Sequence, residues 1–306
     1  MATVASFLLR SSLQPSSIPT YQRAWKIFQQ FFNSTFQRPF SVLPISPSVL
    51  ALFIAYLFNA QYAPSTVTTY ISTLGYVHKL RGFPDPSKVF YVSQILKGYS
   101  KVGFRLDSRL PITLPILDKL VSSATSLQGS IYQICQFQAM CALAFYAFLR
   151  IGEITSVSGG YSNPLHLSQI TKILNPAGYL IAFKLTFGDY KHSYKERPFS
   201  LVVSRQTHSC PVELLSKYLA MRGSRPGPIF ITVDGLPVSR STFSNQLATA
   251  IQLCGLPPAR YKGHSFRIGA ASHAAEHGFT DTQIRLLGRW KSNAFQKYIR
   301  VPSLSS

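Results

Sequence analysis

The segment KGHSFRIGAASHAAEHGFTDTQIRLLGRWKSNAFQKYIR, residues 262–300, places chemically active side chains on three separate predicted elements. His264 and Arg267 lie three residues apart at a predicted helix start. Trp290 follows a glycine-marked helix end, and Tyr298 lies on a short final helix. Phosphoryl transfer requires a nucleophile, cations that hold the phosphate oxygens, and proton donors for the leaving group. Tyrosine, arginine and histidine can supply all three if the chain folds them into one site.

Capping residues mark the elements of this segment. A helix is expected over residues 265–277, because Gly278 follows it as a stop. Thr280 and Gln283 match a capping box for the next helix, and Ser292 is a suitable cap for the last one. A single tyrosine on a terminal helix is more often a packing residue than a nucleophile. The interpretation of Tyr298 as a nucleophile therefore needs support from the rest of the chain.

The charge balance points to a polyanionic partner. Among 306 residues, 31 Lys and Arg stand against 10 Asp and Glu, which gives a formal net charge of +21. Nucleic acid is the most common partner of such an excess, because its phosphates attract Lys and Arg. An acidic membrane surface is the rival. The longest apolar runs, 49–58 and 139–149, are shorter than the roughly 18 to 20 residues of a spanning helix, so we expect no membrane partner.

The compartment is indicated by the amino terminus and the cysteines. MATVASFLLRSS has no basic residue ahead of its short apolar run, so we expect no secretory signal and an intracellular protein. The four cysteines show no CxxC spacing and fall mostly in apolar helical patterns. We expect reduced packing thiols rather than disulfides or a zinc site. They are Cys135, Cys141, Cys210 and Cys254.

The first hundred residues are a predicted bundle of amphipathic helices. In SIPTYQRAWKIFQQFF, residues 17–32, aromatic side chains recur at helical spacing, with Ser17 as a candidate cap. Three further helices are expected over about 47–57, 64–81 and 89–99. None of these stretches offers paired carboxylates or a nucleophile beside a base. We expect this region to bind rather than to react.

A basic linker rich in Gly and Pro separates two domains. Residues 99–115 show little periodicity, and we place the boundary near residue 107. The result is an amino-terminal helical domain, 1–107, and a carboxy-terminal domain, 108–306. In the second domain we expect helices over 114–123, 131–149, 211–221 and 241–254, and a short strand over 229–233. The expected fold class is mainly α with a small β-sheet, an α+β fold.

Arg150 is a candidate cation at the end of the apolar helix. It follows eleven mostly apolar residues, and Glu153 stands three positions later. A charged residue at the end of a buried helix is expected to form either a salt bridge, here to Glu153, or a contact with a bound ligand. The sequence leaves both interpretations open.

A basic hairpin supplies further cations. Residues 179–187 and 197–204 are rich in β-forming side chains and flank a polar segment, which predicts a β-hairpin. Its tip carries Lys191, His192 and Lys195. Such a tip is either solvated or inserted into a DNA groove.

A competing zinc site is suggested by the HxxEH pattern of His273, Glu276 and His277, which occurs in some zinc peptidases. The pattern is short, and Gly278 ends the helix at once. A third, distant carboxylate ligand would also be needed, and the chain has 10 acidic residues in all. We therefore expect no metal ligand set.

Several motifs resemble those of tyrosine recombinases, the Cre and λ-integrase superfamily. GHSFRIGAA, LGRW and the final YIR resemble the carboxy-terminal signature, in the Cre-like form with Trp in place of a second His. FLRIGEIT, residues 148–155, resembles the first arginine box, and the predicted hairpin resembles the one that carries the family's lysine. The resemblance covers about residues 110–300, and the amino-terminal bundle by general architecture only.

The resemblance implies a role for each side chain. Tyr298 would attack a scissile phosphate and form a 3′-phosphotyrosyl link, with His264 as acid–base partner. Arg150 and Arg267 would clamp the two non-bridging oxygens, because guanidinium groups bind bidentately. Trp290 would donate its indole N–H to a phosphate oxygen.

Two further residues have implied roles. Lys191, chosen by its place after Gly-Asp-Tyr, would protonate the leaving 5′ oxygen, with Lys184 and Lys195 as competitors. Glu153 would support the catalytic side chains. Trp290 stands eight residues before the tyrosine, one fewer than is usual in the family, which predicts a tighter last loop.

The resemblance implies a site-specific recombinase or integrase, with a core-binding domain and a catalytic domain clamped around double-stranded DNA. A homotetramer would exchange the strands, and no metal, ATP or other cofactor would be needed because the phosphotyrosyl link conserves the bond energy. GRWKSNAFQKYIR is similar to recombinases of eukaryotic mobile elements such as DIRS-type retrotransposons and Cryptons. This similarity implies action in the nucleus.

Two other functions stay open. A type IB topoisomerase shares the nicking chemistry but relaxes supercoils as a monomer without site preference. A domesticated DNA-binding protein would bind DNA without cutting it. Relaxation of plain plasmid DNA separates the first from a recombinase, and mutation of Tyr298 separates the second.

Overall fold

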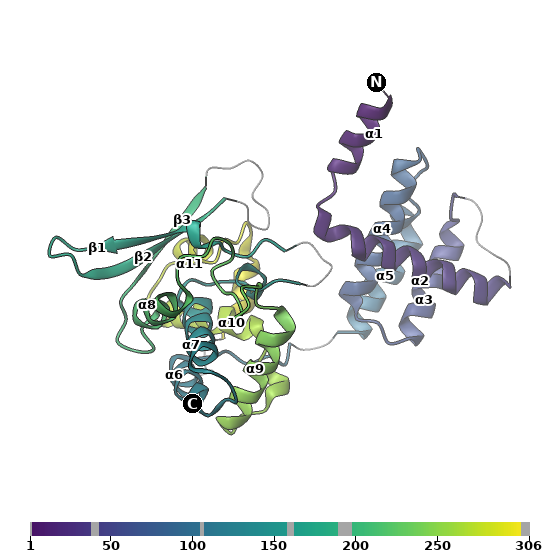
Figure 1. Cartoon of the computed structure of the whole chain (residues 1–306). Coiled ribbons are helices and arrows are strands. Elements are labelled where there is room, and N and C mark those ends of the chain that lie inside the picture. Colours follow the sequence, from purple (N-terminus) through teal and green to yellow (C-terminus); the bar gives the residue numbers. More distant parts are fainter. Residues whose placement is uncertain (1, 38–42, 105–106, 158–161, 189–197, 301–306) are drawn as a thin grey trace. The chain divides into compact units, whose positions relative to one another are not determined.

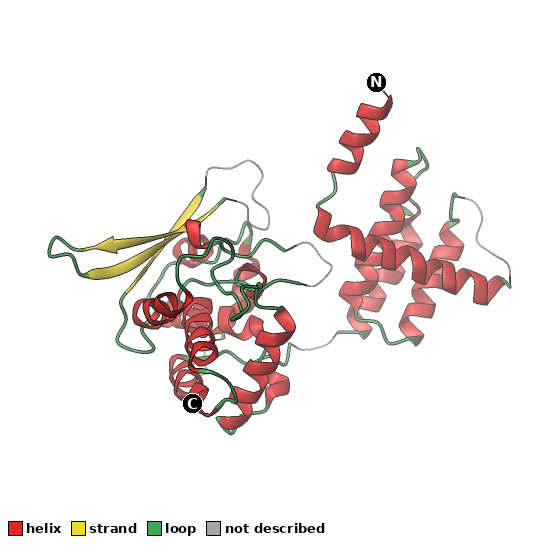
Figure 2. Ribbon diagram, viewed as in Figure 1, coloured by secondary structure: helices red, strands yellow, loops and turns green. Residues whose placement is uncertain are grey.

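The computed structural model describes residues 2–37, 43–104, 107–157, 162–188 and 198–300. The chain divides into two compact units, Met1–Asp107 and Ser108–Ser306. The described part of the first unit is helical, and the second combines helices with a three-stranded sheet (Figure 2). The expected fold class, mainly α with a small β-sheet, is confirmed.

Helices α1 to α5 form the amino-terminal unit (Figure 1). They are α1 (Ala2–Ser11), α2 (Ile18–Phe36), α3 (Pro47–Asn59), α4 (Pro64–Leu80) and α5 (Phe90–Val102). The four helices expected from the sequence are present as α2 to α5, whereas α1 was not expected. The predicted cap at Ser17 is wrong. Its side chain makes no capping bond, because Ser17 lies in a 3-10 turn, Pro15–Ser17, that runs directly into α2.

Aromatic side chains fill the interior of this unit. Phe28 of α2 and Phe53 of α3 are fully buried, and their rings meet edge to face with centroids 5.2 Å apart. The Tyr99 hydroxyl of α5 donates to the Tyr62 carbonyl at 2.7 Å. This bond ties α5 to the turn between α3 and α4, so four helices share one core.

A buried helix organises the carboxy-terminal unit. Every residue of α7 from Cys135 to Phe145 is buried, and α6, α8 and α10 pack around it. The helices of this unit are α6 (Leu114–Ser123), α7 (Ile131–Tyr146), α8 (Pro211–Arg222), α9 (Arg240–Leu253), α10 (Gly263–Glu276) and α11 (Asp281–Leu287). A 3-10 helix, η7 (Asn293–Tyr298), follows them.

Helix α7 ends at Tyr146, earlier than the predicted end at Leu149. Phe148 has a φ of 50°, in the left-handed region, so the helix cannot continue through it. The turn presents the Phe148 carbonyl to Arg267, whose NH1 donates to it. This partner lies far along the chain, which explains why the local apolar pattern overestimates the helix.

Three antiparallel strands form the sheet in the order β1-β2-β3. They are β1 (Ile170–Leu174), β2 (Leu180–Phe187) and β3 (Phe199–Ser204). The predicted hairpin is confirmed as β2 and β3, and β1 was not expected. Phe183, Leu185 and Phe187 of β2 are buried. Because side chains alternate across a strand, these three share the face that adjoins the helices.

The short strand predicted over 229–233 is wrong. Within the described residues, this region makes isolated bridges only, at Pro228 and between Ile231 and Pro237. Proline has no N–H to donate, so a ladder cannot extend through either position. The Ile231 carbonyl instead accepts a hydrogen bond from the Gln136 side chain at 2.5 Å.

All four cysteines are free, and three of them are buried. Burial raises the pKa of the Cys141 thiol, which keeps it protonated. Among the described residues, no helix combines the length and the apolar character needed to cross a membrane.

Helix α10 approaches the segment before α6 very closely at Gly269. A Cβ at this position would lie 1.8 Å from the Ile112 carbonyl oxygen. The Ile112 N–H donates to the Ser265 carbonyl at 3.0 Å and keeps the two segments together. The backbone atoms leave no room for a side chain at Gly269.

We predict that Gly269→Ala destabilises the carboxy-terminal unit by about 3 kcal/mol, in the upper part of the range for overpacked sites. The matched control is Gly98→Ala in α5, where a Cβ meets nothing within 4 Å. This control should stabilise its helix by about 0.5 to 1 kcal/mol. Urea unfolding of the full chain, followed by circular dichroism, measures both changes. An unchanged midpoint for Gly269→Ala would contradict the close approach.

Candidate active site

Tyr298 and His264 meet in the structure. Tyr298 ends η7, a 3-10 helix that begins after Ser292, whose side chain accepts a hydrogen bond from the Ala294 N–H. His264 lies in the first turn of α10, and its Nε2 is 2.7 Å from the Tyr298 hydroxyl oxygen. This hydrogen bond pairs a potential nucleophile with a potential proton acceptor.

Contacts on both sides hold Tyr298 against α10. Phe295, one turn earlier, is 1% exposed and anchors η7 in the core. The Ser272 hydroxyl donates to the Tyr298 carbonyl at 3.4 Å and accepts from the Arg300 N–H at 2.8 Å. Because the backbone is fixed before and after the residue, the half-buried phenol keeps its direction toward the histidine.

Arg267 lies beneath this pair and is 1% exposed. Its NH2 donates to the Gly288 carbonyl at 2.7 Å, and its NH1 donates to the Phe148 carbonyl. The guanidinium carbon lies 4.2 Å from the centre of the Trp290 ring, a cation–π contact. One side chain of α10 therefore joins the carboxy-terminal ends of α7 and α11.

The charge of Arg267 is influenced by several groups. Burial lowers its pKa from 12.5 to about 9, and repulsion from Arg150 and Arg289 acts in the same direction. The coulombic effects of Glu153 and Tyr298 raise it. The group stays cationic at neutral pH. Because its folded pKa lies below the unfolded value, its burial opposes folding at neutral pH, and stability increases as the pH rises through about 9.

Trp290 lies between Arg267 and Tyr298. Its ring centroid is 5.3 Å from that of Tyr298. Just before it, Arg289 has a φ of 53°, in the left-handed region. A Cβ on Gly288 would lie 1.6 Å from the Trp290 ring, so the ring folds back over the glycine. The left-handed turn at Arg289 and the folding of the ring over Gly288 bring the Trp290 indole to Tyr298, although only seven residues separate the two.

Arg150 lies close enough to Arg267 for their charges to repel each other. It precedes the 3-10 turn η4 (Ile151–Glu153), and its NH1 is 3.1 Å from Glu153 Oε1. Its backbone N–H donates to the same carboxylate at 2.8 Å. The salt bridge considered from the sequence is therefore present. A Cβ on Gly263 would lie 2.3 Å from the Ile151 side chain, so the start of α10 packs directly on this turn.

Arg289 also belongs to the site, although the motifs assign it no role. Its NH2 lies 2.7 Å from Glu153 Oε2, and its guanidinium carbon lies 4.3 Å from the centre of the Phe187 ring. The residue is 5% exposed. Its one sequence signal is a cation placed directly between Gly288 and Trp290, which looks like an ordinary charge at a helix end.

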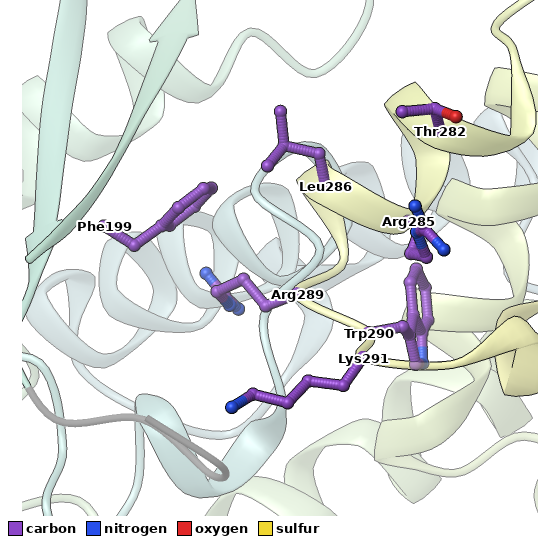
Figure 3. A pocket seen from close by; sticks show the side chains of 7 residues that line it. All are labelled: Phe199, Thr282, Arg285, Leu286, Arg289, Trp290 and Lys291. Atoms are coloured by element: carbon purple, nitrogen blue, oxygen red, sulfur yellow. The ribbon is translucent and has the colours of Figure 1, made fainter. Parts of the chain in front are cut away.

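A pocket of about 520 Å³ opens beside the site (Figure 3). Trp290 borders this pocket and also contacts Tyr298. The walls come from the start of β3, from α11 and from the residues that follow α11. The lining residues are Phe199, Thr282, Arg285, Leu286, Arg289, Trp290 and Lys291.

The lysine expected from the hairpin is not placed. Lys191, His192 and Lys195 lie outside the described residues. Lys184 is described, and its side chain is exposed on β2. It alternates with Phe187 across the strand, and Phe187 is the side chain that reaches the site. Lys184 thus lies on the sheet face that points away from the site.

The HxxEH residues lie at the end of α10. The His277 Nδ1 is 2.8 Å from the His273 carbonyl oxygen, and the two rings have centroids 4.0 Å apart. Burial and the nearby His277 lower the pKa of His273, whereas Glu276 raises it. In the part of the chain that the structure describes, no group of three or more His, Cys, Asp or Glu could hold a metal ion.

Comparison with known proteins identifies the fold. No family model and no curated protein matches the chain. Among solved structures, a λ integrase (75–356) dimer bound to a COC′ core site is 13% identical, with a TM-score of 0.66 and coverage of 100% of this chain and 95% of that chain. The Tn1549 transposon integrase with transposon right end DNA is 12% identical, with a TM-score of 0.64 and coverage of 97% and 93%.

The XerH site-specific recombinase bound to a palindromic difH substrate is similar in the same way. It is 16% identical, with a TM-score of 0.65, and the match covers 92% of this chain and 75% of that chain. At this level of identity the likeness concerns the fold. The chain has the tyrosine recombinase fold, as its motifs led us to expect.

We predict that Gly288→Ala displaces the Trp290 ring, because the new Cβ would occupy the space of the ring. Tryptophan emission should shift to the red and become more accessible to iodide quenching. Trp25, the other tryptophan, adds a constant background from the other unit. Gly98→Ala is the control and should leave the emission unchanged. An unaltered spectrum for Gly288→Ala would contradict the packing of the ring over the glycine.

Proposed function

We propose that the protein is a site-specific DNA recombinase or integrase, which cuts and rejoins duplex DNA through a 3′-phosphotyrosyl intermediate on Tyr298. The observation that carries this proposal is the 2.7 Å hydrogen bond between His264 Nε2 and the Tyr298 hydroxyl. It lies beside buried Arg267, in a chain with the tyrosine recombinase fold. A tyrosine that merely packs a terminal helix has no need of these neighbours.

The cutting step begins with proton transfer. A free tyrosine is neutral at pH 7, so its oxygen becomes a good nucleophile only when a base removes the proton. His264 Nε2, 2.7 Å from the hydroxyl oxygen, would accept it. The Tyr298 oxygen then bonds to phosphorus, the bond from phosphorus to the 5′ oxygen breaks, and that oxygen leaves with a proton. The resemblance gives this last proton to Lys191. Attack by a 5′ hydroxyl in the reverse direction rejoins the strand.

Arginine charge would stabilise the transition state. The pentavalent phosphorus carries more negative charge than the phosphodiester, and fixed cations act most strongly at the place where charge develops. Arg267 is fixed by two carbonyls and by Trp290. Arg150 has five N–H donors, so it can keep its bond to Glu153 and still present others to an oxygen. The Trp290 indole N–H would add a neutral donor.

The partner in this proposal is double-stranded DNA. The net charge of +21 suits a phosphate backbone, and the λ, Tn1549 and XerH structures are complexes with DNA. We further propose a homotetramer on the DNA and a role in a mobile element, with action in the nucleus. The bond energy stays in the phosphotyrosyl link, so the reaction as proposed uses neither ATP nor a metal ion.

We predict that wild-type protein, but not Tyr298→Phe, carries covalently attached DNA. Tagged proteins are expressed in cells, lysed in strong detergent without crosslinker and pulled down, and attached DNA is sequenced. Loss of the phenolic oxygen should reduce attached DNA to background, because the covalent bond forms on that oxygen. Tyr179→Phe, at a residue that is 71% exposed, is the matched control and should retain the DNA.

The sequenced ends decide among the alternatives. Ends that cluster at one sequence support a site-specific recombinase, whereas scattered ends favour a type IB topoisomerase. Absence of DNA from wild type, although both proteins bind DNA in native buffer, would identify a DNA-binding relic. That result would overturn the proposed function.

A further inference from the structure

The Glu153 carboxylate is shared by two arginines. Its Oε1 is 3.1 Å from Arg150 NH1, and its Oε2 is 2.7 Å from Arg289 NH2. The glutamate side chain is 14% exposed, and that of Arg289 is 1% exposed. A carboxylate this far from water requires a partner charge. Arg289 supplies one, and its NH2 also donates to the Phe148 carbonyl at 3.4 Å.

The backbone conformation at residue 289 directs the Arg289 side chain toward Glu153. Its φ of 53° turns the chain sharply between Gly288 and Trp290, so that the neighbouring side chains diverge. Trp290 contacts Tyr298, whereas Arg289 packs on the Phe187 ring of β2. In Figure 3 the Arg289 guanidinium extends toward Phe199 and away from the Trp290 ring. Arg289 is therefore directed away from the tyrosine.

A charge count shows what Arg289 contributes. Arg150, Arg267 and Arg289 bring +3 and Glu153 brings −1, which leaves +2 in this cluster. Without Arg289 the sum falls to +1, and Arg150 alone would have to neutralise the carboxylate. An anion in the site would then face a partly uncompensated negative charge, at a depth where solvent screens charges weakly.

We propose that Arg289 is a positioning residue, which neutralises Glu153 and thereby leaves the Arg150 guanidinium available to an anion beside Tyr298. This inference rests on the proposed function, in which that anion is the scissile phosphate. It assigns the arginine of the LGRW motif to the charge balance of the site.

The test uses an inorganic oxyanion, so it does not depend on DNA cutting. Tungstate is titrated at low, fixed ionic strength into the full chain carrying Trp25→Phe, and Trp290 fluorescence reports binding because Arg267 lies on its ring. Arg289→Met should weaken the apparent Kd about tenfold, which corresponds to about 1.4 kcal/mol. Arg289→Lys keeps the charge but loses the planar contact with the Phe187 ring, so it should weaken the Kd less than Arg289→Met does.

The decisive variant is the pair Glu153→Gln with Arg289→Met. It restores the count of +2 from Arg150 and Arg267, so tungstate affinity should return to within about threefold of the parent. A merely structural loss at Arg289 would not recover when a second buried group is altered. Arg285→Met is the matched control, since this exposed arginine lines the same pocket, and the ion pairs of Glu153 within the described residues are with Arg150 and Arg289. It should change the Kd by less than about threefold.

Two results would overturn the inference: parental affinity in Arg289→Met, or a double variant as weak as the single one. Covalent capture in cells gives the matching readout for the reaction, with less DNA expected on Arg289→Met than on wild type. If wild type captures no DNA while the tungstate series shows the expected pattern, the recombinase proposal fails and the charge role of Arg289 is supported. The two failures are thus distinguishable.

Discussion

The carboxy-terminal unit depends on one buried cation. Arg267 donates to the carbonyls of Phe148 and Gly288, which terminate two different helices. Unpaired carbonyls at helix ends require donors, and a buried guanidinium requires acceptors, so each satisfies the other. The cost of burying the charge appears in the lowered pKa of Arg267. Without this side chain, the ends of α7 and α11 would lose the group that holds them at one place.

Close backbone packing makes this arrangement possible. Gly263 lets the start of α10 rest on Ile151, and Gly269 lets the same helix pass the Ile112 carbonyl. Between these two contacts lie His264 and Arg267. The helix is therefore fixed on both sides of its functional turn, which limits how far the histidine and the arginine can move apart. Precise placement of this kind suits a reaction in which charge develops at one atom.

Local patterns predicted most elements of the fold, because apolar periodicity and capping residues act over a few positions. Thr280 and Gln283 form the expected capping box, and helices α2 to α5 follow their apolar spacing. Two of the errors have different causes. Helix α7 stops early because Arg267 engages the Phe148 carbonyl from far along the chain, and such a partner becomes visible only in three dimensions. The strand predicted over 229–233 is absent for a reason that the sequence contains, because Pro228 and Pro237 have no N–H to donate.

The candidate site likewise combines features that the motifs predict with features that depend on distant contacts. Tyr298, His264, Arg267 and Trp290 come together as the motifs led us to expect, but the contacts of Arg289 do not follow from its place in LGRW. In the sequence it is a cation after a glycine, and its acidic partner, Glu153, lies more than a hundred positions earlier. The short spacing from Trp290 to Tyr298 has a related explanation. A left-handed residue at 289 reverses the chain over Gly288, so the indole reaches the phenol by a sharper turn rather than by a longer loop. Arg289 thus has two linked effects: its backbone directs Trp290 toward the tyrosine, and the same turn directs its own side chain toward the glutamate.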